Sequence, residues 1–141
     1  MWAAVSTFAG VNAEFWPLFR MTAPEHVRRE GLAAVQLGRR LCRSWVLLLG
    51  VLPVDYDDIT LEQIEPPHRF LERSTMLSQR HWEHERTIEP APGGCTITDG
   101  VRYQPRLPIP DLFLRWLYRA VFAHRHRRLR KRFGGQALPR S

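Results

Sequence analysis

The chain has 141 residues, of which 44% are apolar and 25% charged, as expected for one ordinary globular domain. The longest apolar run, residues 45–54, is too short to cross a bilayer, which takes about 20 residues. Two cysteines, Cys42 and Cys95, are too few for a disulfide scaffold. We therefore expect reduced thiols in a cytoplasmic protein.

The net charge of +7 is unevenly distributed along the chain. Nine of the 21 basic residues lie in 112–141, a segment without Asp or Glu, so residues 1–111 are close to neutral. The plainest interpretation is a solvated helix end, where cations favour the negative end of the helix dipole. The second interpretation is a weak contact of this segment with an anionic membrane. Binding to nucleic acid is the least favoured, because no aromatic residues are interleaved with the basic ones. The basic residues concerned are Arg125, Arg127, Arg128, Arg130, Lys131 and Arg132.

Two short helices are predicted before residue 31. Asn12 is the expected N-cap of a helix over 13–16, and Thr22 is a capping hydroxyl with Glu25 three residues later. A strand, bounded by glycines, is predicted over 41–49. Residues 53–58 are expected to form a turn or a short helical piece.

Alternating or apolar patterns then predict four more strands, over 59–65, 70–77, 81–89 and 95–103. Prolines at 105, 108 and 110 exclude regular structure before a final helix over 112–133. We expect Asp111 to cap this helix and Gly134 to end it. One stripe of the helix can face the sheet, while the part beyond His124 should project into solvent. The stripe consists of Leu114, Leu117, Tyr118 and Val121.

Alternation along the strands assigns side chains to two faces. Glu83, Glu85 and Glu89 share one face of the 81–89 strand, and three carboxylates would not be buried together, so this face must be solvated. The opposite face therefore points inward and carries Trp82, His84, Arg86 and Ile88. In the next strand the inward set is Cys95, Ile97, Asp99, Val101 and Tyr103.

The inward surface combines apolar walls with a few polar groups, as ligand pockets do. Arg86 and Asp99 either pair across the hairpin, as buried charges usually do, or contact a ligand directly. His84 is either a hydrogen-bonded core histidine or an acid–base group. Metal binding is not expected, because His81 and His84 face opposite ways, as do His124 and His126, and no cysteine pair has zinc spacing.

Several motifs in this order resemble the SRPBCC superfamily of START-like, helix-grip proteins, most closely bacterial members of unassigned function. A Trp-x-His-x-Arg strand is followed by a Gly-Gly-x-Thr-x-x-Asp hairpin, a Pro-Arg pair and a basic helix end. The matching residues are Trp82, His84, Arg86, Gly93, Gly94, Thr96, Asp99, Pro105, Arg106 and 125–129. Upstream, the matching residues are 10–14, Pro17, Met21, Thr22, Ser44, Trp45, Gly50 and Pro53.

The resemblance implies an α+β helix-grip fold, in which a curved antiparallel sheet wraps around a long C-terminal helix. It implies one ligand-binding domain over 1–135, with a polar tail over 136–141, and no cofactor. Family members begin with a strand before the first helix, and Trp2 already occupies the start of that helix. We therefore expect the first strand to be missing from this chain.

Three functions follow. The first is binding of a hydrophobic or aromatic small molecule, or a lipid, in a cavity between sheet and helix. The second is a polyketide cyclase or dehydratase that uses His84 or Asp99 as acid or base. The third is an interaction module acting through the basic helix. The expected ligand-binding residues are Trp45, Trp82, His84, Arg86, Asp99, Tyr103, Leu117 and Val121.

Overall fold

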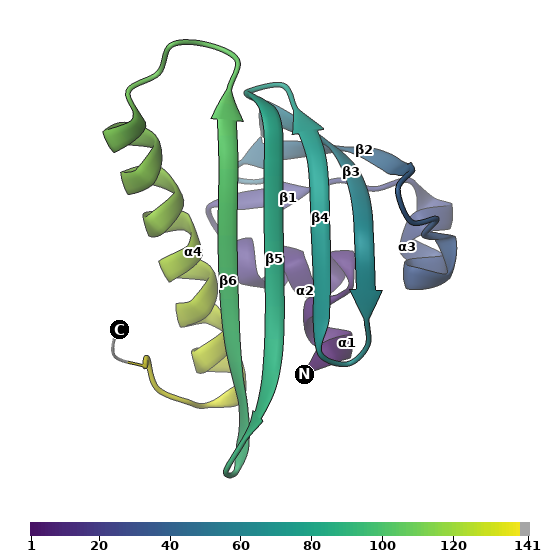
Figure 1. Ribbon diagram of the computed structural model, residues 1–141, viewed down its shortest axis with the longest axis vertical. Helices are drawn as coiled ribbons and strands as arrows, with labels where there is room; N and C mark the ends of the chain where they lie inside the picture. The colour runs from purple at the N-terminus through teal and green to yellow at the C-terminus, as the bar shows by residue number, and fades with distance from the viewer. Residues whose placement is uncertain (139–141) are drawn as a thin grey trace.

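Six antiparallel strands form one sheet whose spatial order follows the chain, β1-β2-β3-β4-β5-β6. The structure, a computed structural model, describes residues 1–138. The sheet curls into half a barrel, and the long helix α4 runs beside it (Figure 1). The strands are β1 Phe19–Met21, β2 Arg40–Leu48, β3 Leu52–Glu65, β4 Arg69–Met76, β5 Gln79–Ala91 and β6 Gly94–Pro105.

The helices lie at the two ends of the chain (Figure 1). The α+β architecture with short N-terminal helices and a long C-terminal helix agrees with the sequence-based expectation. In the described residues the chain begins with a helix, and the edge strand β6 has β5 as its one strand neighbour. The helical segments are α1 Trp2–Val5, α2 Phe8–Phe15, α3 Glu25–Glu30, the 3-10 turn Gly31–Ala34 and α4 Asp111–Phe133.

The predicted turn over 53–58 is wrong, because these residues are the first half of β3. They pair with β2, with Asp57 opposite Ser44 and Asp55 opposite Val46. Pro53 misled the prediction, since proline rarely occurs within a paired strand. Here it lies at a register shift of the β2–β3 ladder, where a missing N–H is tolerated.

The predicted cap at Asn12 is also wrong. Helix α2 begins earlier, with the Thr7 hydroxyl accepting a hydrogen bond from the Gly10 N–H at 3.1 Å. Asn12 lies inside the helix, and its amide exchanges two hydrogen bonds with the backbone of Met21, of 2.7 and 3.0 Å. It therefore ties α2 to β1, a three-residue strand that the sequence patterns did not predict.

The capping role predicted for Thr22 fails for a similar reason. Its hydroxyl accepts a hydrogen bond of 3.0 Å from the backbone N–H of Trp45 and so joins the segment after β1 to β2. Helix α3 starts at Glu25 after Pro24, without a side-chain cap. The helix exists where it was predicted, but the polar side chain before it serves a tertiary contact.

The closing helix begins one residue before its predicted start, because Asp111 is its first residue and not its cap. The Asp111 carboxylate instead accepts a hydrogen bond from the Tyr103 hydroxyl at 2.8 Å and pairs with Arg115. Gly134, at a φ of 78°, ends the helix as predicted.

The second half of α4 does not project into solvent as expected. Arg125 and Leu129 are buried on it, and Leu129 packs in a core cluster with Val5 and Ile88. The helix therefore contacts both α1 and the sheet near its basic end. None of the helices within residues 1–138 combines the length and the apolar character needed to cross a bilayer.

If the basic half of α4 is docked in this way, Leu129→Ala should lower the free energy of unfolding by about 2–5 kcal/mol, the usual cost of such a cavity. The matched control is Leu112→Ala on the same helix, where the side chain is 81% exposed and little should change. Urea denaturation of both variants measures the difference. Equal stabilities would show that the end of the helix is not packed.

Candidate functional site

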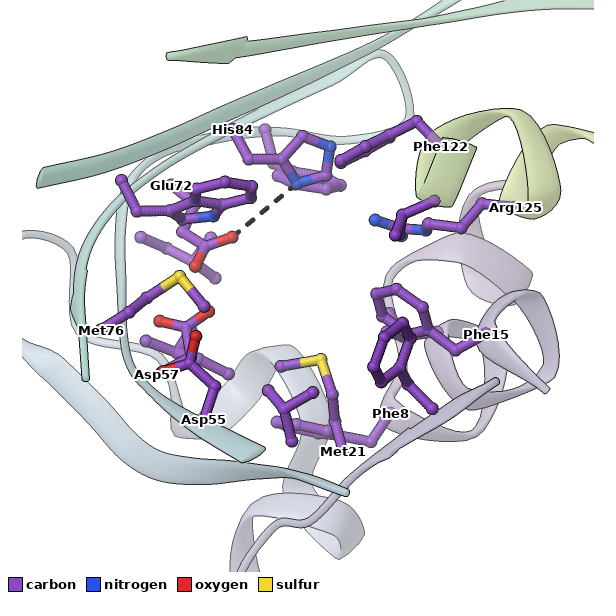
Figure 2. Close-up of a pocket in the computed structure, with 18 of the residues that line it drawn as sticks. Phe8, Phe15, Met21, Asp55, Asp57, Glu72, Met76, His84, Phe122 and Arg125 are labelled. Carbon is purple, nitrogen blue, oxygen red and sulfur yellow. Dashed lines mark ion pairs between the residues drawn. The ribbon is translucent and has the colours of Figure 1, made fainter. Parts of the chain in front are cut away.

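A cavity of about 460 Å³ lies between the concave face of the sheet, the N-terminal helices and α4. This volume is within the range of about 300–1,000 Å³ found for small-molecule sites. Aromatic and aliphatic side chains form most of its wall, and the polar groups gather in two places (Figure 2). Among the apolar lining residues are Phe8, Val11, Phe15, Met21, Val27, Ile59, Phe70, Met76, Trp82, Leu114, Leu117, Val121 and Phe122.

Four of the predicted ligand-binding residues line this cavity: Trp82 and His84 from β5, and Leu117 and Val121 from α4. The alternation along β5 was therefore assigned correctly, because Trp82, His84, Arg86 and Ile88 are buried while the intervening residues are not. Among the described residues, the cavity lining does not include Trp45, Arg86, Asp99 or Tyr103.

Trp45 and Tyr103 lie apart from the cavity for different reasons. On β2 the inward residues are Cys42, Ser44 and Val46, so Trp45 alternates to the outer face, where it is 42% exposed and packs edge-on against Tyr56. Tyr103 faces inward near the start of α4, but Tyr118 packs over its ring at 5.0 Å.

Arg86 is fully buried and is held by two carboxylates. Its Nε and Nη2 atoms donate to Asp99 at 2.7 and 2.8 Å, and its Nη1 and Nη2 atoms donate to Glu14 at 2.8 and 3.0 Å. The predicted pairing of Arg86 with Asp99 across the hairpin is thus confirmed. Burial opposes the charged guanidinium, but the two carboxylates outweigh it and raise its pKa.

Glu14 is the residue that sequence reasoning overlooked. It lies on α2, 72 residues from Arg86, and is 2% exposed. Nothing in the local pattern of a short helix marks one glutamate as buried, so no spacing rule could have found it. Its carboxylate also accepts from Arg125 of α4 at 2.9 Å, and it therefore joins three elements.

Two histidines complete the network around Asp99. Nε2 of His84 lies 2.8 Å from Asp99 Oδ1, and Nε2 of His126 lies 2.6 Å from Oδ2. Burial alone would raise the pKa of Asp99, but hydrogen bonds from His126, His84 and Arg86 hold it well below its usual value. Asp99 is therefore a buried anion that all its neighbours stabilise.

His84 connects this network to the cavity. Its ring packs edge-on against Phe70 and Phe122, at 5.4 and 5.2 Å between centroids, and its Nδ1 faces Glu72 at 3.8 Å (Figure 2). Of the two predicted acid–base candidates, His84 and Asp99, the first alone lines the cavity. Both ring nitrogens of His84 face carboxylates.

A pair of acidic side chains forms one wall of the cavity. Asp57 on β3 and Glu72 on β4 are 4% and 9% exposed and interact directly. Burial, together with the charge of Glu72, raises the pKa of Asp57 well above its usual value. Burial also opposes ionisation of Glu72, but the nearby His84 and Asp57 and a hydrogen bond of 2.7 Å from the Ser74 hydroxyl outweigh it and lower the pKa of Glu72. Asp57 is thus the protonated member of the pair and Glu72 the anion.

Arg125 stands across the cavity from this acidic pair (Figure 2). Its guanidinium lies over the rings of Phe15 and Phe122, at 4.6 and 5.0 Å from their centroids. Burial and the nearby charge of Arg86 lower its pKa. Within residues 1–138 no group of three or more metal-ligating side chains gathers at one point.

Comparison with known proteins supplies the family. Residues 1–133 match the family described as a domain of unknown function, DUF8410. The chain belongs to the DUF8410 family. The searches of curated proteins and of solved structures found no match. The site of this DUF8410 domain is therefore interpreted from its own residues.

Removing Arg86 should be costly because Glu14 and Asp99 would stay buried and both would lose the guanidinium that they share, which leaves Glu14 with Arg125 and Asp99 with two histidines. We expect Arg86→Met to lower the free energy of unfolding by about 3–5 kcal/mol, measured by chemical denaturation. The control is Arg73→Met, which breaks an exposed pair with Glu83 and should cost far less. A similar small loss in both variants would contradict the role given to Arg86.

The acidic pair predicts a pH dependence of stability with a defined sign. Because the pKa of Asp57 is raised on folding, its stabilising contribution is complete below its unfolded pKa of about 4 and is lost as pH rises through the folded pKa. Denaturation at a series of pH values should therefore show wild type losing stability relative to Asp57→Asn as pH rises above about 4.

The neighbouring Asp58 provides the control with the opposite sign. Arg43 lowers the pKa of Asp58, so wild type should gain stability relative to Asp58→Asn as pH rises from the acid range toward about 4, the unfolded pKa, and should change little above it. Parallel pH curves for the two variants would refute the assignment of the proton to Asp57.

Proposed function

We propose that this protein binds a hydrophobic or aromatic small molecule, or a lipid, in the cavity between the sheet and α4. The observation that carries the proposal is the cavity of about 460 Å³, which is lined mainly by apolar side chains from the N-terminal helices, the sheet and α4. An empty apolar cavity lowers the stability of a fold, so binding of an apolar ligand in this space would stabilise the protein. The wall also holds the few polar groups that orient a ligand.

The proposal includes the helix-grip relationship expected from the sequence. A curled antiparallel sheet beside a long C-terminal helix, with short helices in the N-terminal part of the chain, agrees with that layout (Figure 1). SRPBCC membership is part of the proposal. So is the cytoplasmic location, for which the free thiols of Cys42 and Cys95 are the support.

A second candidate is the cyclase or dehydratase activity. The observation in its favour is that His84, Glu72 and Asp57 present an imidazole, a carboxylate and a protonated carboxyl group to one cavity. Such an enzyme would convert the molecule that it retains. His84→Gln should then leave retention of the molecule unchanged while the converted product disappears from its mass spectrum.

The third candidate is a weak contact of the basic helix with an anionic surface. Arg127, Lys131 and Arg132 are exposed and remain available for it. Arg125 is not, because it is buried against Glu14, and the Arg128 side chain donates to the backbone of Ala13. Binding to anionic vesicles should fall steeply with salt if this contact operates.

Filling the cavity tests the first proposal. Val121→Phe adds a ring to the cavity wall, while Ala123→Phe adds a larger increment of volume on the exposed face of the same helix. Titration with the neutral fluorophore N-phenyl-1-naphthylamine should show affinity reduced roughly tenfold or more for the first variant and unchanged for the second.

Native mass spectrometry of the purified protein adds an independent measurement, since a binder should carry an apolar molecule that Val121→Phe excludes. Absence of any bound molecule, together with no uptake of the fluorophore, would overturn the proposed function.

A further inference from the structure

Two buried hydrogen-bond acceptors on the cavity wall have no partner. They are Oδ1 of Asp57 and Oε1 of Gln79, in side chains that are 4% and 0% exposed. Buried polar atoms are almost always hydrogen-bonded, so two orphans on one wall require an explanation. Both residues line the cavity.

The topology brings these acceptors to one side of the cavity. Asp57 and Asp55 alternate to the same face of β3, and Asp55 accepts hydrogen bonds from the hydroxyl and the backbone N–H of Ser78, the residue before Gln79. Glu72 on the neighbouring strand interacts with Asp57. In Figure 2, Asp55, Asp57 and Glu72 lie along one wall, opposite Phe8, Phe15 and Arg125. We call Asp57, Glu72 and Gln79 the acceptor wall.

The acceptor wall carries the negative charge of Glu72 and two acceptor oxygens without partners, so a ligand group with positive charge and several hydrogen-bond donors complements it. We propose that the ligand is an aromatic or aliphatic molecule bearing a protonated amine, which binds the acceptor wall while its apolar body fills the cavity. This inference rests on the proposed function and names its substrate class. An ammonium group has three N–H donors and no acceptor, whereas a hydroxyl has one donor. It therefore matches a set consisting of a carboxyl pair and an amide oxygen.

Arg125 does not reverse this preference. Its charge is already paired with Glu14, and its guanidinium stacks on Phe15 and Phe122. A carboxylate ligand would have to bind on that side and would leave both orphan acceptors without a donor. Its apolar body would then lie against the anion of Glu72.

The test uses three ligands with the same body: 2-(1-naphthyl)ethylamine, 2-(1-naphthyl)ethanol and 1-naphthylacetate. Calorimetric titration of the full chain at neutral pH should show the amine binding roughly tenfold or more tightly than the alcohol, since hydrogen bonds that involve charged groups are stronger than those between neutral groups. The carboxylate should bind most weakly. Equal or tighter binding of the alcohol or the carboxylate would overturn the inference.

Variants locate the amine. Glu72→Gln, which removes the anion of the wall, and Gln79→Met, which removes an acceptor without a partner, should each remove most of the preference for the amine and leave the alcohol unaffected. The second variant decides the matter if the first does not fold. Asp58→Asn on the outer face, where Asp58 pairs with Arg43, should behave as wild type. If both cavity variants still prefer the amine, the cation binds elsewhere, and the proposal that the acceptor wall binds it is refuted.

The two proposals fail in different ways. Uptake of N-phenyl-1-naphthylamine without any preference for the amine refutes the acceptor wall and leaves the binding function standing. If neither the fluorophore nor any of the three naphthyl ligands binds, the binding function itself is refuted, and the inference about its ligand with it.

Discussion

The arrangement of this molecule depends on one buried guanidinium. Arg86 binds Asp99 on the neighbouring strand and Glu14 on α2, and Glu14 in turn binds Arg125 on α4. Sheet, N-terminal helix and C-terminal helix therefore meet at a single cluster of charges. Because buried charges without partners are strongly unfavourable, this cluster selects the one packing in which all of them are paired. The cavity is the space that remains between the elements so fixed.

The same cluster sets the chemistry of the cavity. Asp99 holds Nε2 of His84, which leaves Nδ1 directed toward Glu72. His84 and Ser74 stabilise the ionised carboxylate of Glu72, and the proton of the acidic pair therefore stays on Asp57. A chain of polar contacts thus runs from the charge cluster around Arg86 through His84 and Glu72 to Asp57, whose Oδ1 has no hydrogen-bond partner. The wall that would orient a ligand is tied to the residues that hold the fold together.

Local sequence patterns predicted what depends on local geometry. Alternation placed Trp82, His84, Arg86 and Ile88 on the buried face of β5, because successive side chains of a strand must point to opposite sides. The strand β6 and the closing helix were also predicted near their observed bounds, and the pairing of Arg86 with Asp99 followed from the hairpin. Trp45 was misplaced because an apolar run lacks the alternation that would show which residues face outward.

The sequence by itself determined an α+β chain with a strongly patterned hairpin, a long basic helix and the inward face of β5. Only the tertiary structure decided the rest: that Glu14 is the counter-ion of Arg86, that Arg125 is buried, and that Asp57 and Glu72 share a wall. The physical reason is distance along the chain. Glu14 and Arg86 are 72 residues apart, and Glu14 and Arg125 are 111 apart. Periodicity reports which way a side chain points within its own element, but its partner depends on how the elements pack.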